Sequence, residues 1–259
     1  MTFMWKYGFA SVVGTSHRKT KAPVQDASGA AVMPDAAGTP VMVAVASDGA
    51  GSAAQAQIGS RLACDLFLAD VKSYFACGGT IAQFAPDFIT GWIARFQEAV
   101  QQQAEASQHA VPDYACTLLA ALIGPDCAVY FQLGDGAIVA ATREAEDSYT
   151  IVCWPQQGEY ANTTNFLTAA DAKEKCFATL QNQAVDEVAL FTDGIQNLVL
   201  DYRTKTAHSP FFTPLFAWVR SRPAGFSEEL SQALAVYLNS AKMNARTDDD
   251  KTLILATRK

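Results

Sequence analysis

Hydrophobic residues along this chain gather into short continuous runs instead of alternating with polar ones. Continuous apolar runs bounded by turn residues are typical of β-strands that are buried on both faces. The runs of this kind are residues 5–13, 41–47, 115–123, 127–133, 137–142, 149–154, 187–192 and 253–257. Gly124, Pro125 and Asp126 favour a tight turn between two of these runs, so residues 115–133 are predicted to form a β-hairpin.

Three longer segments repeat their apolar residues every three or four positions, which is the period of an amphipathic helix. They are residues 53–69, 80–107 and 227–241. Pro86 is expected to break or restart the second helix near its beginning, because proline lacks the backbone N–H that a helix interior needs. Ser227 can cap the third helix. A short helix or turn is expected over residues 194–200.

Two segments show no clear hydrophobic period. Prolines and glycines are frequent among the small residues of 15–40, so this segment is predicted to be mainly loop, with space for a hairpin. Residues 155–185 are predicted to form a long loop or flap, with a short strand at 165–167.

The order of the predicted elements indicates the fold class. Strands come first, followed by two helices, a meander of strands, a helix and a last strand. Strands grouped in this way favour antiparallel sheets with helices packed outside, an α+β layered fold, over alternating βαβ units. The 259 residues show no internal repeat or low-complexity linker, so one domain over residues 1–259 is the economical prediction.

Composition and charge exclude several classes of protein. Hydrophobic residues make up 50% of the chain and charged residues 17%, unlike a disordered protein or a coiled coil. The 19 Lys and Arg against 26 Asp and Glu lack the basic footprint of a nucleic-acid binder. No signal peptide and no apolar run of membrane-spanning length is evident. The six cysteines contain no CxxC pair. We therefore expect reduced cysteines and a cytoplasmic protein that binds neither nucleic acid nor membrane.

Aspartates at strand ends are the strongest chemical signal. Asp48 and Asp193 each follow an apolar run and precede a glycine, and residues 248–250 are three aspartates directly before the last strand. If the last strand lies antiparallel beside one of the others, these carboxylates meet at one edge. Such a cluster repels itself unless cations occupy it, and oxygen-only ligation suits Mg²⁺ or Mn²⁺. The alternative is that each Asp-Gly is an ordinary turn.

Several short motifs resemble those of the type 2C metal-dependent protein phosphatases, in the family's order and over nearly the whole chain. They are Gln25-Asp26-Ala27, Ser47-Asp48-Gly49-Ala50-Gly51, Cys116-Thr117, Gly134-Asp135-Gly136, Thr192-Asp193-Gly194 and Asp248-Asp249-Asp250-Lys251-Thr252. The resemblance implies a four-layer sandwich of two antiparallel sheets flanked by helices. It also implies two Mn²⁺ or Mg²⁺ ions, with a third in some bacterial members.

The resemblance assigns metal-site roles by position. Asp48 would bridge both ions and the Gly49 carbonyl would bind the second ion. Asp193 and Asp249 would bind the first ion, and Asp26 would hold a metal-bound water. Asp135 is a candidate for the third ion. Asp249 is preferred to its neighbours because Thr252 sets the register of the last motif, although a shift of one residue stays open.

The implied activity is that of a hydrolase, a serine/threonine protein phosphatase. A metal-bridging hydroxide would attack phosphoserine or phosphothreonine in line. Arg18 stands near where the family binds the substrate phosphate, although it lies eight residues before Asp26, further than usual; the neighbouring His17, Lys19 and Lys21 are the alternatives for this contact. Ala50 replaces the histidine of eukaryotic relatives, so water or His17 would protonate the leaving group. The alternative for the segment around Arg18 is a solvated basic loop.

The resemblance also implies partners and leaves other functions open. Phosphorylated proteins would be the substrates of a monomeric enzyme, and a serine/threonine kinase would act in opposition. Residues 155–185, including 158–162, lie where substrate choice would be set. The alternatives are a catalytically silent protein of this fold that binds a phosphoprotein, and a phosphatase of small molecules.

Overall fold

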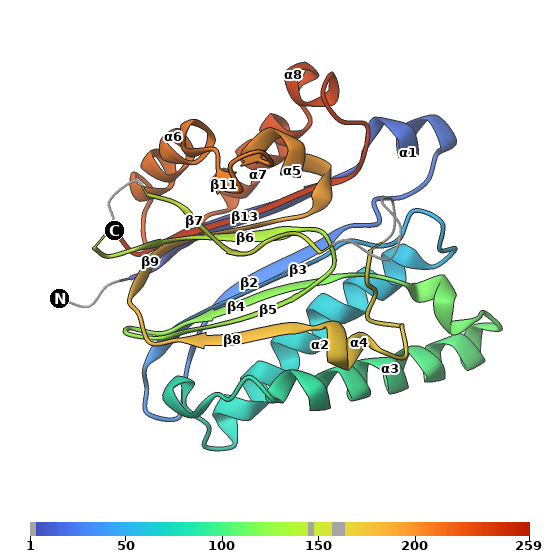
Figure 1. Cartoon of the computed structure of the whole chain (residues 1–259), viewed down its shortest axis with the longest axis horizontal. Helices are drawn as coiled ribbons and strands as arrows, with labels where there is room; N and C mark the ends of the chain where they lie inside the picture. The colour runs from blue at the N-terminus through green and yellow to red at the C-terminus, as the bar shows by residue number, and fades with distance from the viewer. Residues whose placement is uncertain (1–3, 145–147, 157–163) are drawn as a thin grey trace.

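The computed structural model describes residues 4–144, 148–156 and 164–259. Two β-sheets stack face to face, and helices cover both outer faces (Figure 1). The first sheet has the order β12 (Gly225–Phe226), β1 (Lys6–Val12), β13 (Lys251–Thr257), β9 (Val185–Phe191), β6 (Ala137–Thr142) and β7 (Thr150–Cys153). The second has the order β2 (Ala27–Pro34), β3 (Pro40–Ser47), β4 (Leu118–Ile123), β5 (Ala128–Leu133) and β8 (Phe177–Gln181). All neighbouring strands are antiparallel except β1 and β12.

The helices form two outer layers. The layer beside the second sheet consists of α2 (Ala56–Ala76), α3 (Phe88–Ser107) and α4 (Ala172–Lys175), with 3₁₀ turns at Ile81–Gln83 and Val111–Tyr114. The layer beside the first sheet consists of α5 (Asp193–Val199), α6 (Ser209–Arg220), α7 (Glu228–Leu238) and α8 (Ala241–Asn244). A short helix α1 (Thr15–Thr20) and the small hairpin β10 (Leu200–Asp201) and β11 (Thr206–Ala207) complete the described elements.

Burial on both faces explains why the central strands are continuous apolar runs. Successive side chains of a strand point to opposite faces of its sheet. In β3, Val43 and Val45 pack against the α2–α3 layer, whereas Ala44 and Ala46 pack against the other sheet. In β13, Leu255 packs against the α5–α7 layer. Both faces of a central strand therefore need apolar residues, which removes the polar alternation of an exposed sheet.

Most predicted elements are confirmed. The hairpin over residues 115–133 is β4 and β5, and the last strand lies antiparallel beside β9. Residues 15–40, predicted to be mainly loop with space for a hairpin, instead contain α1 and the single strand β2, which pairs with β3. Ser227 caps α7, since its hydroxyl accepts a hydrogen bond from the Leu230 N–H at 3.1 Å. The α+β class and the layered sandwich are therefore correct.

Other expectations are wrong or lie outside the described residues. Residues 165–167 form no strand, whereas Phe177–Gln181 within the expected flap is the edge strand β8. Helices α1 and α6 were not predicted. Residues 158–162, expected to set substrate choice, lie outside the described residues. None of the described helices is long and apolar enough to cross a membrane.

Candidate metal centre

Five predicted aspartates lie at one edge of the two sheets, because each adjoins the end of a strand. They are Asp26, Asp48, Asp135, Asp193 and Asp249. The strand register aligns these ends. Ala27 pairs with Ser47 in the second sheet, so the residues beside them leave the sheet together. Phe191 pairs with both Ala137 and Leu253 in the first sheet, which aligns three further strand ends.

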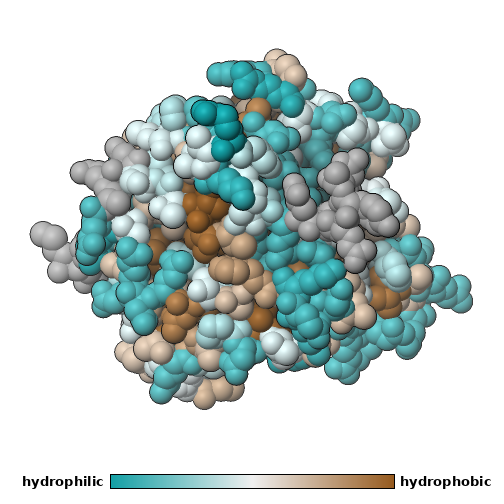
Figure 2. All heavy atoms as spheres, viewed as in Figure 1, coloured by the Kyte–Doolittle hydropathy of each residue, from teal (hydrophilic) through white to brown (hydrophobic). Residues whose placement is uncertain are grey.

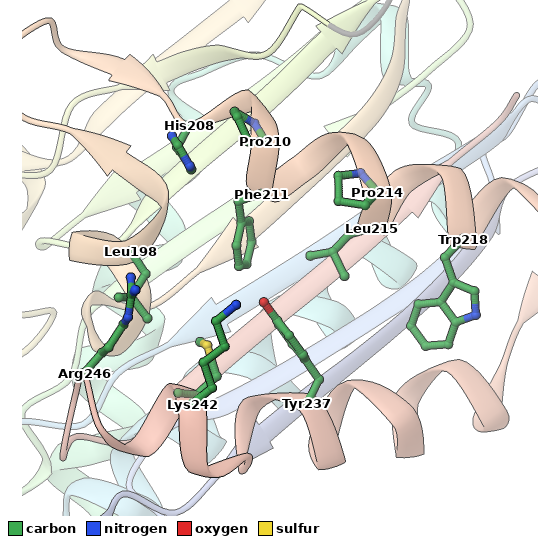
Figure 3. A pocket seen from close by; sticks show the side chains of 11 residues that line it. Leu198, His208, Pro210, Phe211, Pro214, Leu215, Trp218, Tyr237, Lys242 and Arg246 are labelled. Atoms are coloured by element: carbon green, nitrogen blue, oxygen red, sulfur yellow. The ribbon is translucent and has the colours of Figure 1, made fainter.

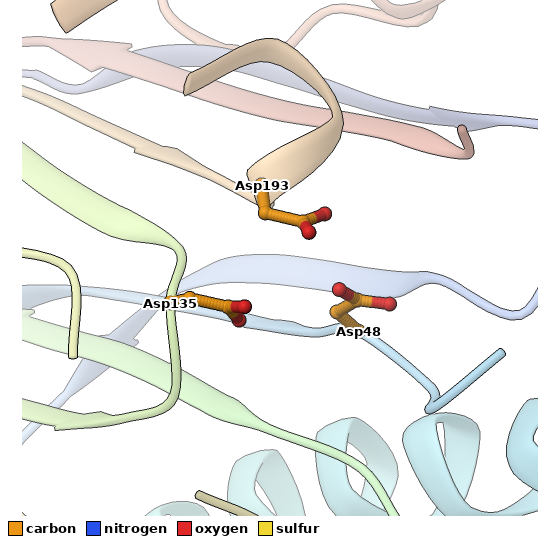
Figure 4. A group of neighbouring side chains, drawn as sticks. All are labelled: Asp48, Asp135 and Asp193. Atoms are coloured by element: carbon orange, nitrogen blue, oxygen red, sulfur yellow. The ribbon is translucent and has the colours of Figure 1, made fainter. Parts of the chain in front are cut away.

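Asp48, Asp135 and Asp193 form the centre of this group. One carboxylate oxygen from each lies within 4.8 Å of the others. Figure 4 shows the three side chains converging from three separate segments on a common space. Thr117 fixes the backbone beneath Asp48: the Asp48 N–H donates to Thr117 Oγ1 at 2.9 Å, and the Thr117 N–H donates to the Asp48 carbonyl at 2.8 Å. These two hydrogen bonds tie the backbone of Asp48, just after β3, to Thr117, just before β4.

Asp26 is buried directly behind this group. Its Oδ2 lies 2.7 Å from the Thr192 hydroxyl and 2.8 Å from the Thr252 hydroxyl. The Asp48 carboxyl lies close enough to Asp26 that each side chain affects the pKa of the other. The two threonines come from the ends of β9 and β13, so Asp26 joins the two sheets at the site.

The clustered carboxyl groups titrate far above ordinary aspartates. Burial, followed by the negative charge of Asp250, raises the pKa of Asp26 to about 7. Burial and the charges of Asp135 and Asp249 raise the pKa of Asp193 to about 7. Burial and the neighbouring carboxylates raise the pKa of Asp48 as well. Without a cation, the site therefore retains protons that ordinary aspartates lose well below neutral pH.

Asp249 and Asp250 have different surroundings, which bears on the register of the last motif. Asp250 is buried, and its carboxylate accepts hydrogen bonds from the Gly14 N–H at 2.6 Å and the Gln25 N–H at 2.5 Å. Asp249 is more exposed, and its charge contributes to the raised pKa values of Asp135 and Asp193. Asp250 thus ties residues 14–25 to β13, whereas Asp249 lies beside the cluster.

His17 and Arg18 lie on α1. Their side chains form hydrogen bonds with residues outside the group of five clustered aspartates. Nδ1 of His17 is 3.0 Å from Asp250 Oδ1. The Arg18 guanidinium is exposed and donates to the Asn239 side chain at the end of α7. Of the predicted site residues, the structure therefore brings the carboxylates together and leaves the two basic residues at the border of the site.

Close backbone approaches explain two glycines of the site. A Cβ at Gly194 would lie 1.8 Å from the Asp250 carbonyl oxygen. Gly134 has φ of +113°, and its Cβ would lie 2.5 Å from Thr117 Cγ2. Only glycine fits either position without a backbone shift. Gly49, whose carbonyl was predicted as a metal ligand, forms an isolated bridge with Cys116 beside Asp48.

The arrangement fits divalent cations of the Mg²⁺ or Mn²⁺ type. Oδ1 of Asp135 is buried and has no hydrogen-bond partner among the described residues. Within the same residues, Asp26, Asp48, Asp135 and Asp193 form no ion pair with a basic side chain. A buried carboxylate oxygen without a hydrogen-bond partner, inside a cluster of carboxylate oxygens, suits these hard cations because they prefer oxygen ligands.

Three threonines of the family motifs support the site through hydroxyl contacts that were not predicted. Thr117, Thr192 and Thr252 each hold an aspartate through a hydroxyl, and only a threonine beside a strand-end aspartate could have indicated this role. Tyr202 also escaped prediction. Burial, followed by the negative charges of Asp135 and Asp193, raises the pKa of its hydroxyl, and its ring lies 5.1 Å from that of Trp154. This aromatic pair therefore lies near the cluster.

Comparison with known proteins agrees with the fold. Residues 13–238 match the family model of protein phosphatase 2C. The chain therefore belongs to the protein phosphatase 2C family.

Particular relatives extend this result. The chain is 34% identical over 252 residues to serine/threonine-protein phosphatase 3 of Escherichia coli strain K12, covering 97% of this chain and 98% of that one. Serine/threonine phosphatase Stp1 from Staphylococcus aureus has a similar structure, with a TM-score of 0.62, 18% identity, and coverage of 98% and 95%. PppA of Pseudomonas aeruginosa gives a TM-score of 0.63, 16% identity, and coverage of 98% and 97%. At such identities the solved structures are evidence for the fold alone.

Proposed function

We propose that this protein is a metal-dependent phosphatase that hydrolyses phosphoserine and phosphothreonine in proteins. The observation that carries the proposal is the cluster of Asp48, Asp135 and Asp193, in which three carboxylates meet without a neutralising basic side chain among the described residues. Membership of the protein phosphatase 2C family and the E. coli relative support the reaction class. Mn²⁺ and Mg²⁺ are the proposed metals.

The proposed ligands divide between the two sheets. Asp48 and the Gly49 carbonyl would contribute from the second sheet, and Asp193 and Asp249 from the first. Asp26, behind them, would orient the attacking water through its carboxylate, and Asp135 would hold a third ion. When bound, the cations would supply Lewis acidity for activating water and positive charge to offset the phosphoryl oxygens.

The chain's own residues keep these groups in place during hydrolysis. Thr192 and Thr252 hold one oxygen of Asp26, which leaves its other oxygen for water. His17 is the proposed proton donor to the leaving serine or threonine oxygen, with Asp250 orienting the ring through Nδ1. Arg18 is the proposed clamp for the substrate phosphate. That role requires its guanidinium to exchange Asn239 for the substrate.

The cellular setting is a further part of the proposal. We propose a single catalytic domain over residues 1–259, acting as a monomer in the cytoplasm against a serine/threonine kinase. The net charge of −7 supports the monomer, because like charges oppose self-association.

An activity panel tests the proposal. Purified protein with Mn²⁺ is offered phosphoserine and phosphothreonine peptides, an aryl phosphate and a set of sugar phosphates. We expect turnover of the peptides and the aryl phosphate, and its loss in Asp48→Asn. The control is Asp126→Asn, which changes an exposed turn far along β4 and β5 from the site.

The panel also separates the alternatives. Equal turnover by wild type and Asp48→Asn would show that a contaminant or another site hydrolyses the substrate. Turnover confined to sugar phosphates would indicate a small-molecule phosphatase. No turnover of any substrate would favour a catalytically silent protein that binds phosphoproteins.

A further inference from the structure

A groove separate from the metal centre opens in the helical layer over the first sheet. It has a volume of about 600 Å³ and lies between α6 and α7, with α8 at one end (Figure 3). None of the five clustered aspartates lines it. Its volume falls within the roughly 300–1,000 Å³ typical of small-molecule sites.

Apolar side chains extend along the length of the groove. Phe211, Leu215 and Trp218 occur on α6 at intervals of four and three residues, so they share one face of the helix. Figure 3 shows them in a row that faces Tyr237 of α7. The row spans about 10 Å of helix axis. The groove is therefore an elongated channel with an apolar row along α6, and not a round cavity.

The two ends of the channel differ in charge. Lys242 on α8 and Arg246 just after it lie at one end, and neither forms a side-chain hydrogen bond or ion pair with another described residue. In Figure 3 the Lys242 ammonium points toward the Tyr237 hydroxyl. At the Trp218 end, α7 begins with acidic residues and Arg222 is paired with Glu229 at 2.9 Å. Unpaired cations therefore occur at a single end.

We propose that this channel binds an amphiphilic anion, with an unbranched aliphatic chain along α6 and a carboxylate or phosphate-type head at Lys242 and Arg246. The apolar row matches the chain, and the two unpaired cations with the Tyr237 hydroxyl match the head. The acidic start of α7 disfavours the reverse orientation. The charge pattern is local, because the protein as a whole carries a net charge of −7 and would repel anions elsewhere.

Calorimetry on the full chain without added metal tests the proposal. The probes are decanoate and decylphosphonate, whose carbon–phosphorus bond a phosphatase does not hydrolyse. We expect saturable binding of one molecule of at least one anion, and much weaker binding of decanol and decyltrimethylammonium. Octanoate should bind several-fold more weakly than decanoate, because each buried methylene contributes up to about fourfold.

Variants locate the binding to the channel. Lys242→Glu with Arg246→Glu should weaken anion binding about tenfold or more, because it replaces the charge-assisted contacts with repulsion. Both residues are exposed, so the fold should tolerate the change. The matched control, Lys173→Glu with Lys205→Glu, alters the net charge equally at other surfaces and should leave the affinity unchanged.

Several results would overturn the proposal. These are the absence of saturable binding, equal binding of the alcohol and the quaternary amine, or equal loss of affinity in both charge-reversed pairs. Binding only to anionic vesicles, or only to an acidic amphipathic peptide, would also overturn it. Because the readout is binding without metal, its outcome is independent of phosphatase activity.

Discussion

Strand β9 carries carboxylates at both ends, and their surroundings differ completely. At its start, Asp186 and Glu187 are buried in contact with arginines: Arg258 Nε donates to Asp186 at 2.9 Å, and Arg220 Nη2 donates to Glu187 at 2.7 Å. Just beyond its other end, a carboxylate oxygen of Asp193 lies within 4.8 Å of oxygens from Asp48 and Asp135, and Asp193 forms no ion pair with a basic side chain among the described residues.

The difference separates a structural role from a functional one. Buried charges are ordinarily paired, because an unpaired buried charge costs several kcal/mol. The paired end satisfies that requirement within the fold. Asp193 has no basic partner among the described residues, so its carboxylate needs either a proton or a bound cation. The carboxylates at the start of β9 are therefore neutralised by arginines of the chain itself. Asp193, beyond the other end, needs protons or cations from outside the chain.

Removing one carboxylate at the unpaired end should have the largest effect. We expect Asp193→Asn to lower turnover with Mn²⁺ by about 10³-fold, because the ligand loss removes several kcal/mol of transition-state stabilisation. The same variant should leave the metal-free protein equally stable or more stable, since it relieves repulsion. Steady-state kinetics and urea unfolding measure the two effects. A strong loss of metal-free stability would contradict the comparison.

The same change at the paired end should have the opposite pattern. Asp186→Asn leaves the buried Arg258 guanidinium without its carboxylate, so the free energy of unfolding should fall by about 3–5 kcal/mol. Turnover per folded molecule should stay near that of the wild type. Chemical denaturation measures the free energy of unfolding. Protein quantification that does not depend on the active site gives the turnover per folded molecule. Unchanged stability would show that the pairing is energetically unimportant.

The metal-free protein should become less stable as the pH rises. Asp26 and Asp193 have pKa values of about 7 in the folded state against 3.8 for an ordinary aspartate. Between about pH 4 and pH 7 the folded protein retains protons that the unfolded chain has released, so the free energy of unfolding falls with rising pH. We expect a loss of several kcal/mol across this window, because either group alone would contribute about 3 kcal/mol.

Saturating Mn²⁺ provides the contrast for the pH experiment. The ions should replace the retained protons, so unfolding with Mn²⁺ should show little of this decline. Urea unfolding with a chelator and with Mn²⁺ compares the two conditions. A metal-free protein that gains stability as the pH rises through the window would contradict the shared burial of these carboxylates.

Removing a hydroxyl behind the cluster should have the smallest effect. Thr252→Val loses the contact at 2.8 Å with Asp26 Oδ2 but keeps the side-chain shape, so Mn²⁺ affinity should fall about tenfold. Thr252→Ser restores a hydroxyl and should recover most of that affinity. Equal Mn²⁺ titrations for the valine variant and the wild type would exclude a positioning role for Thr252.

The sequence predicted the central strands and the strand-end aspartates because both depend on local patterns. Burial on two faces requires continuous apolar runs such as 41–47, and a close approach to Asp250 requires glycine at position 194. The mutual placement of Asp48 and Asp193, by contrast, depends on the register between distant strands. The sequence predicted that placement only on the condition that the last strand lies antiparallel beside another strand, and through the family resemblance.

The missed elements lack such local signals. Helix α6 contains Pro214 in its interior, which sequence rules disfavour, yet Phe212 and Phe216 are fully buried in the core and hold the helix in place. Strand β8 is an edge strand with partly exposed side chains, so it shows no continuous apolar run. Helix α1 buries no residue, which leaves it without hydrophobic periodicity.

Titration calorimetry with Mn²⁺ tests the central claim most directly. At neutral pH we predict that the wild type binds at least two ions per chain and releases protons, because the raised pKa values leave protons for the metal to displace. Asp193→Asn should lose the tightest binding, whereas Asp186→Asn should retain it under conditions where it stays folded. Absence of Mn²⁺ binding by the wild type up to millimolar concentrations would contradict the assignment of the carboxylate cluster as a metal centre.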